Sequence, residues 1–175
     1  ILNQAGADSF IVQQFGIIRS DEEWLRVQSN PRISSIDADA VRRHSLLASA
    51  VMLGSDERGR VTYRAASLEN VRILGVTQEY VNFSNFDAER GRLMSPTEVA
   101  LARPVAVLGS QVADRLFGPD VDPIEKTLQI EGVHFRVVGV MERKGKFLNF
   151  NRDNLILIPL GSFARRDAVF NFLIA

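Results

Sequence analysis

The chain has 175 residues with 21 acidic and 21 basic side chains, so its formal net charge is zero and no overall field draws it toward nucleic acid or anionic lipid. It has no cysteine, which excludes disulfides, thiolate catalysis and zinc–thiolate sites. Hydrophobic residues make up 46% and charged residues 24%, which is typical of a globular domain, and no apolar run is long enough to cross a bilayer.

The first part of the chain predicts short strands and short helices. Ser9–Gln13 alternates as a strand does, and a capping box from Ser20 to Glu23 opens a helix that ends near Gln28. Asp37 is predicted to cap a second helix over residues 38–44.

A hairpin and a further strand are predicted next. The apolar run Leu46–Leu53 enters a strand, Gly54–Gly59 is a polar turn, and Arg60–Arg64 returns as the second arm of the hairpin. Leu68–Val76 is a further strand.

The middle of the chain carries clear helix signals. Ser95 is predicted to cap a short helix, with Pro96 at its first position and Glu98 reaching back to the cap. After a buried strand, Val105–Leu108, Ser110 is predicted to cap a second helix that runs to Phe117 and ends at Gly118.

The last part predicts strands. Thr127–Ile130 and Val133–Met141 alternate in hydrophobicity, and only Glu131-Gly132 separates them, which favours a tight hairpin. Leu155–Ile158 is a buried run, and Val169–Ala175 is another apolar run. Because helices are short and several strands are joined by hairpins, the sequence predicts a mixed α+β fold.

One ordered series of motifs covers most of the chain. It consists of Gly75-Val76-Thr77 with Tyr80, Gly91-Arg92-Leu93, Val105–Gly109, Val112-Ala113, Leu116–Gly118, Asp122–Ile124 with Lys126, Phe135–Val140 and Ile158–Leu160. This series resembles the periplasmic core domain of MacB-type ABC transporter permeases. The match is strongest from about residue 74 to residue 160, and Glu125 departs from it because the family usually carries glycine there.

The resemblance implies a fold and a domain division. We expect two small mixed α/β subdomains: a porter-like subdomain from residues 1–75 and 155–175, and an inserted Sabre-like subdomain from residues 76–154. Because the chain begins at Ile1 and ends in an apolar run, we also expect it to be a piece of a longer polypeptide.

The resemblance also implies a function. We expect a non-catalytic domain that faces the periplasm or cell exterior from the bacterial inner membrane, and that couples cytoplasmic ATP hydrolysis to export or to work in the periplasm by mechanotransmission. The implied partners are flanking transmembrane helices, an ABC ATPase, a second permease subunit and, in some relatives, a periplasmic adaptor protein. Neither a cofactor nor a nucleic-acid partner is expected.

Signals of catalysis or metal binding are weak. Lys126 lacks the glycines that a phosphate-binding loop places before it. Asp120, Asp122 and Glu131 imitate calcium-loop spacing, but the sharp-turn position holds no glycine, so turn chemistry is the better interpretation. The two histidines, at positions 44 and 134, have no ligand-spaced neighbours.

One loop, over residues 142–154, interleaves basic and aromatic side chains. Such a mixture can grip a partner protein, although its phenylalanines can equally fold back onto the core. The predicted contact residues are Lys144, Lys146, Phe147, Phe150 and Arg152.

Two other functional classes stay open at the level of sequence. A soluble module that captures a ligand or protein would need an apolar pocket with converging polar groups. An enzyme of unrecognised type would need a cleft with strongly perturbed carboxylates.

Overall fold

The computed structural model of the chain describes residues 11–13, 20–27, 29–31, 33–83, 86–147, 150–151, 153–163 and 172–174. The helices in these ranges are α1 (Asp21–Val27), α2 (Ser35–His44), the 3₁₀ helix η1 (Gln78–Asn82), α3 (Pro96–Ala100), α4 (Ser110–Phe117) and α5 (Leu160–Phe163). The longest of these described helices, α2, has 10 residues, and none could span a membrane.

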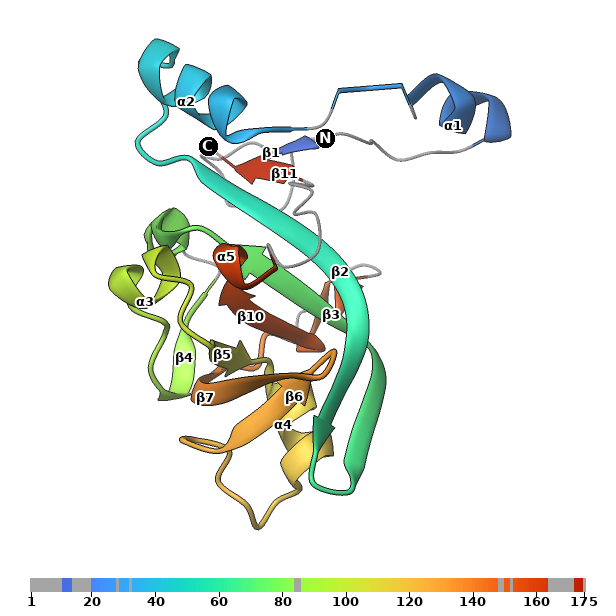
Figure 1. The fold of residues 1–175 in the computed structure, drawn as a ribbon, viewed down its shortest axis with the longest axis vertical. Coiled ribbons are helices and arrows are strands. Elements are labelled where there is room, and N and C mark those ends of the chain that lie inside the picture. The colour runs from blue at the N-terminus through green and yellow to red at the C-terminus, as the bar shows by residue number, and fades with distance from the viewer. Residues whose placement is uncertain are drawn as a thin grey trace.

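The described strands are interspersed with these helices, but β2 and β3, and then β6 to β10, follow one another with no helix between them (Figure 1). They are β1 (Ile11–Gln13), β2 (Met52–Tyr63), β3 (Ala66–Val76), β4 (Ala88–Gly91), β5 (Val105–Leu108), β6 (Thr127–Ile130), β7 (Val133–Met141), β8 (Lys146–Phe147), β9 (Phe150–Asn151), β10 (Leu155–Pro159) and β11 (Phe172–Ile174). The predicted mixed α+β fold is confirmed.

The main sheet closes on itself. Its strand order is β1-β11-β2-β3-β10-β5-β7-β4, and β6 pairs with both β7 and β2. The path β2-β3-β10-β5-β7-β6 therefore returns to β2 and forms a ring of six hydrogen-bonded strands. Two pairs, β10 with β3 and β5 with β7, are parallel, and the other pairs are antiparallel.

The long strand β2 links this ring to the chain ends. It pairs with β11 through Met52–Gly54, with β3 along most of its length, and with β6 at Val61 and Thr62. Figure 1 shows it as one curved arrow running most of the length of the molecule. The predicted polar turn at Gly54–Gly59 is therefore wrong, because that segment lies inside the strand.

Tertiary pairing explains this difference. The polar side chains of the middle of β2 find partners across the hairpin: Arg72 donates to Asp56 at 2.6 and 2.9 Å. A Cβ atom at Gly59 would come within 2.7 Å of the end of the Ile73 side chain, so a larger residue there would require that side chain to move.

The apolar residues form separate clusters on the two faces of the sheet. Ala106 and Leu108 of β5 belong to the cluster that packs with α4, whereas Val105 and Val107 belong to the cluster with η1 and α3. This division follows from the alternation of side chains along a strand. A third, smaller cluster packs the buried Ala38 of α2 against the start of β2.

Two predicted helix caps differ from the observed ones, by three residues in α2 and by one residue in α4. The cap of α2 is Ser34 rather than Asp37, and Asp37 completes its capping box from the third helical position. The cap of α4 is Gly109, and the buried hydroxyl of Ser110 has no hydrogen-bond partner in the described chain. Both helices begin one or more residues before the predicted start.

Other local predictions are confirmed. Ser95, Pro96 and Glu98 form the predicted capping box of α3. Glu131 and Gly132 join β6 to β7 with φ values of 48° and 81°, as a tight hairpin turn requires. Glu125, at the position where glycine was expected, has a φ of 62° and accepts a hydrogen bond from Arg136 at 2.6 Å.

The two-subdomain division stays a prediction. The closed ring takes β2, β3 and β10 from the porter-like segments and β5, β6 and β7 from the Sabre-like segment. The boundary after residue 75 falls one residue before the end of β3.

Candidate functional site

The predicted contact loop forms a small hairpin of its own. Its strands β8 and β9 pair antiparallel, with Lys146 opposite Asn151 and Phe147 opposite Phe150. This β8–β9 hairpin connects β7 to β10, the strands on either side of β5. Arg152 lies outside the described residues, and for positions 146, 147 and 150 the structure describes the backbone alone.

Asp153 fixes the base of the β8–β9 hairpin. Its carboxylate is buried and accepts hydrogen bonds from the backbone N–H of Lys144 at 2.9 Å and of Gly145 at 3.1 Å. Its carbonyl oxygen accepts from the N–H of Gln111, in the first turn of α4, at 3.1 Å. The hairpin is thus tied to the helix beside it.

Close packing supports this attachment. A Cβ atom at Gly109 would fall well inside van der Waals contact with the carbonyl oxygen of Asp153. The N–H of Gly109 donates to the carbonyl of Leu155 at 2.7 Å. Sequence reasoning missed both Gly109 and Asp153 as parts of this site, although an acidic residue closing a basic loop is a signal for turn formation.

Two ion pairs flank the hairpin base. Lys144 Nζ lies 2.7 Å from Asp87 Oδ2, and Arg143 pairs with Asp114 of α4. Lys144 is therefore already paired within the chain, unlike the free contact residue that the sequence suggests. Because at least one partner of each pair is more than half exposed, each pair contributes at most about 1 kcal/mol to stability.

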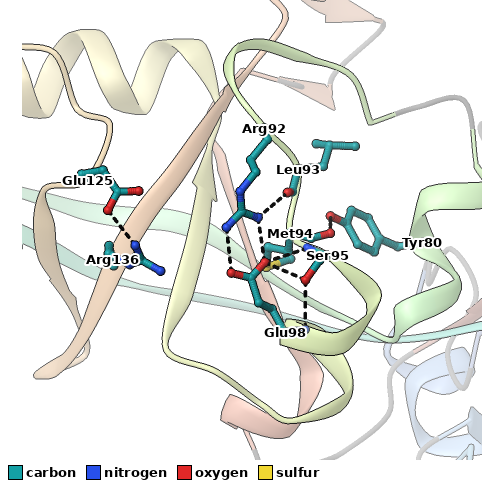
Figure 2. A network of polar contacts seen from close by, with 8 residues as sticks. All are labelled: Tyr80, Arg92, Leu93, Met94, Ser95, Glu98, Glu125 and Arg136. Carbon is teal, nitrogen blue, oxygen red and sulfur yellow. Dashed lines mark hydrogen bonds and ion pairs between the residues drawn. The ribbon is translucent and has the colours of Figure 1, made fainter.

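A second polar cluster joins η1 to the start of α3 (Figure 2). Arg92 donates to both carboxylate oxygens of Glu98, and Glu98 also accepts from the N–H and hydroxyl of Ser95. The buried Tyr80 hydroxyl donates to the carbonyl of Met94 at 2.7 Å. These bonds hold the segment between β4 and α3 against the sheet.

The electrostatics of this cluster indicate a structural role. The hydrogen bonds from Arg92, with help from Ser95, lower the pKa of Glu98 from 4.5 to about 2. Burial raises the pKa of Tyr80 well above its ordinary value of 10. Neither Glu98 nor Tyr80 exchanges a proton near neutral pH, so this pair does not fit general acid–base chemistry.

The histidines lie apart from acidic groups that could share a metal. Across the described ranges, no group of three or more His, Cys, Asp or Glu side chains is arranged to hold a metal ion. His134 is exposed on β7, with its Nε2 atom 3.0 Å from Gln129 Nε2, and His44 is exposed in the last turn of α2.

Comparison with known families gives one match that covers nearly the whole chain. Residues 2–174 match the family described as the MacB-like periplasmic core domain. A macrolide export ATP-binding/permease protein MacB from Bdellovibrio bacteriovorus is 33% identical over 129 residues, which are 74% of this chain and 20% of that protein. A pyoverdine export ATP-binding/permease protein PvdT from Pseudomonas savastanoi pv. phaseolicola is 30% identical over 141 residues, 78% of this chain and 22% of that protein.

Solved structures agree on the fold. The periplasmic region of MacB from Actinobacillus actinomycetemcomitans superposes with a TM-score of 0.77 at 17% identity, over 97% of this chain and 74% of that one. The extracellular domain of the noncanonic ABC-type transporter YknZ from Gram-positive bacteria gives 0.72 at 15% identity, over 94% and 80%. The chain spans about a fifth of the length of the curated relatives that it matches.

Proposed function

This chain belongs to the family of MacB-like periplasmic core domains, and we propose that it acts as a stiff, non-catalytic lever that passes motion from a transporter's membrane part to its periplasmic end. The lever would couple ATP hydrolysis in a separate ATPase to export. Its partners would be the membrane helices and ATPase of the parent permease, a second permease subunit and a periplasmic adaptor. The names of the relatives, which pair an ATP-binding unit with a permease, support this context.

The observation that carries the proposal is the continuity of β2. One end of β2 pairs with β11, which pairs in turn with β1, so the first and last described strands lie side by side at one edge of the sheet. The other end of β2 closes the ring through β6. Motion imposed near β1 and β11 therefore reaches the far end of the domain through a hydrogen-bonded ladder that has a single register shift, between Gly59 and Val61.

Packing supports stiffness as well. The ring of strands is filled by buried apolar side chains, and close-packed interiors transmit strain because they compress little. A hinge would need a segment with few backbone hydrogen bonds, whereas β2 pairs with β3 from Gly54 to Tyr63 with one register shift near Gly59.

We also propose that the β8–β9 hairpin contacts a neighbouring subunit or the adaptor. Its support is the way in which Asp153 holds the hairpin's base on α4 while its tip forms a sheet separate from the main one. The proposed contact residues are Lys146, Phe147, Phe150 and Arg152. Lys144 supports the contact only indirectly, by pairing with Asp87 at the base of the hairpin.

A break in β2 tests the lever. In the full-length parent transporter, a spin label at Ser67→Cys, near the tip of the β2–β3 hairpin, would report movement between the two copies of the domain when ATP is added. Glu57→Pro removes a ladder hydrogen-bond donor from the middle of β2, because Glu57 has the same orientation toward the partner strand as Leu53, whose carbonyl accepts from the N–H of Thr77. We expect it to abolish the ATP-dependent movement at Ser67 while the ATPase rate is kept.

Glu57→Ala is the matched control, because it removes the same exposed side chain and leaves the ladder intact. It should keep both the movement and the ATPase rate. If Glu57→Pro prevents folding, the double variant with glycine at positions 57 and 58 loosens the strand instead. Full movement at Ser67 in a variant whose β2 is broken would contradict the lever.

A further inference from the structure

A hollow of about 460 Å³ opens between α2, η1, α3 and α5. Figure 1 shows α3 and α5 on the sheet below α2. The apolar wall of the hollow consists of Leu53, Val76, Val99 and Leu160, each of which is at most 7% exposed. The volume lies within the range of about 300–1,000 Å³ that suits drug-sized ligands. We call this hollow the α2–η1 pocket.

The polar side of the α2–η1 pocket carries one ion pair. Arg42 from α2 and Glu79 from η1 both line it, and Arg42 Nη2 lies 3.4 Å from Glu79 Oε1. Arg42 also donates to Asp39 Oδ1 and to the carbonyl of Val51, each at 2.9 Å. One guanidinium therefore serves two carboxylates, and the group of three side chains carries a net charge of −1.

Glu79 has unused hydrogen-bonding capacity. Its Oε2 atom is buried and has no hydrogen-bond partner within the described part of the chain. A buried carboxylate oxygen without a donor is unfavourable, because it has lost its hydration without gaining a hydrogen bond. Because the terminal torsion of a glutamate is soft and two-fold, the carboxylate can turn one oxygen toward the pocket while the other faces Arg42.

We propose that the α2–η1 pocket binds a small molecule with an apolar body and a protonated amine, and that Glu79 holds the amine. The apolar wall takes the body by burying its surface. The net negative charge beside the pocket favours a cation over an anion, and the free carboxylate oxygen selects an N–H donor. This inference stands independently of the transport role.

Such a ligand would also bridge secondary-structure elements that line different parts of the pocket. The pocket draws residues from η1 and α3 on one side and from α2 and α5 on the other. An occupant would contact both groups of elements at once, so we expect it to raise the thermal stability of the domain.

Fluorescence titration of the purified chain tests the proposal. The probe is dansylcadaverine, which joins an apolar fluorophore to a primary amine, and the control is its N-acetyl derivative, which keeps the fluorophore and alkyl chain without the charge. We expect saturable binding of dansylcadaverine at least 10-fold tighter than that of the acetylated compound.

Variants locate the site. Glu79→Gln should weaken dansylcadaverine binding about 10-fold and leave the acetylated compound unaffected. Ala100→Trp, at an exposed position of α3 that lines the pocket, should weaken both compounds by obstruction. Gln78→Trp on η1 obstructs the same pocket if the first variant folds poorly.

The matched control is Glu89→Gln. It removes an exposed carboxylate of β4 that neither lines the pocket nor pairs with Arg42, so dansylcadaverine affinity should stay within 2-fold. The proposal is overturned if the wild-type chain shows no saturable binding, if the charged and acetylated probes bind equally, or if both tryptophan variants fold and bind as the wild type does. If a protein segment and not a small molecule is the occupant of the pocket, the wild-type chain will show no saturable binding of dansylcadaverine.

Discussion

Arg92 donates two hydrogen bonds to Glu98, one from Nη1 to Oε2 at 2.7 Å and one from Nη2 to Oε1 at 2.8 Å. This bidentate pair closes over the capping box of α3, because Glu98 also accepts from the backbone of Ser95. A single carboxylate therefore fixes a helix start and the strand exit that precedes it. The contribution of this pair to the free energy of unfolding should exceed that of an ordinary surface ion pair, since the Glu98 side chain is only 17% exposed.

Glu98→Gln should lower the free energy of unfolding by about 1–2 kcal/mol at pH 7, because the charge-assisted bonds are lost while the helix start is retained. Urea denaturation measures the change. Glu89→Gln, at an exposed position of β4, is the control and should be close to neutral.

The effect of Glu98 should depend on pH. Its pKa falls from 4.5 in the unfolded chain to about 2 in the fold, so its contribution is complete above pH 5 and is lost as the pH falls toward 2. The stability difference between the wild type and Glu98→Gln should therefore be much smaller at pH 3 than at pH 6. An equal difference at both pH values would show that the carboxylate charge is irrelevant.

Asp153→Ala should destabilise the chain by about 2–3 kcal/mol, because it leaves the N–H groups of Lys144 and Gly145 without their buried acceptor. Amide hydrogen exchange at these two residues should accelerate more than exchange in β10. Asp120→Ala, in an exposed turn, is the comparison. Unchanged exchange at the hairpin base would contradict the anchoring role of Asp153.

Gly109→Ala should be more damaging than its backbone angles suggest. Its φ of −67° suits any residue, so the whole penalty comes from the clash of the new Cβ with the carbonyl of Asp153. We expect a loss of at least about 3 kcal/mol, as for other overpacked sites. Gly118→Ala has open space, but the φ of 72° and ψ of −176° at this position are essentially confined to glycine, so it should cost about 1–3 kcal/mol. Thermal unfolding of both variants gives the order, and the reverse order would refute the packing argument.

Replacing Phe147 and Phe150 by serine tests the proposed contact of the β8–β9 hairpin. In the parent transporter we expect weaker assembly with a neighbouring subunit or adaptor, measured by co-purification, while the isolated domain keeps its thermal stability. Val133→Ser, at an exposed position near the β6–β7 turn, serves as the apolar control. If folding, transport and complex formation are all unchanged, the hairpin is only a connection.

Local signals in the sequence were sufficient where neighbouring residues decide the structure. The capping box at Ser95 and Glu98 was predicted at the correct residues, because its hydrogen bonds join positions three apart. The hairpin at Glu131 and Gly132 was predicted for the same reason.

Long-range pairing decided what the sequence could not reveal. The polar residues from Asp56 to Arg60 indicate a turn when they are considered alone. In the fold, Arg72 and Glu69 of β3 pair with them across the hairpin, and Glu131 accepts from the N–H of Arg60. These partners lie up to 71 positions away along the chain, so no local pattern announces them.

The candidate site shows the same limit. The basic and aromatic residues of the loop were visible in the sequence, but the role of Asp153 was not. Its carboxylate accepts hydrogen bonds from backbone N–H groups, which do not depend on the identity of the donor residue. The α2–η1 pocket likewise depends on bringing Arg42 and Glu79 together from separate elements.

The lever is tested most directly by the distance between spin labels at Gln13→Cys, on β1, and Ser67→Cys, near the tip of the β2–β3 hairpin, within one copy of the domain in the parent transporter. The chain contributes no other thiol, so both labels are unambiguous within it. We predict the same distance with and without ATP, together with a change in the distance between the Ser67→Cys labels of the two copies. A Gln13–Ser67 distance that changes with ATP would mean that the domain bends, and would contradict its action as a stiff lever.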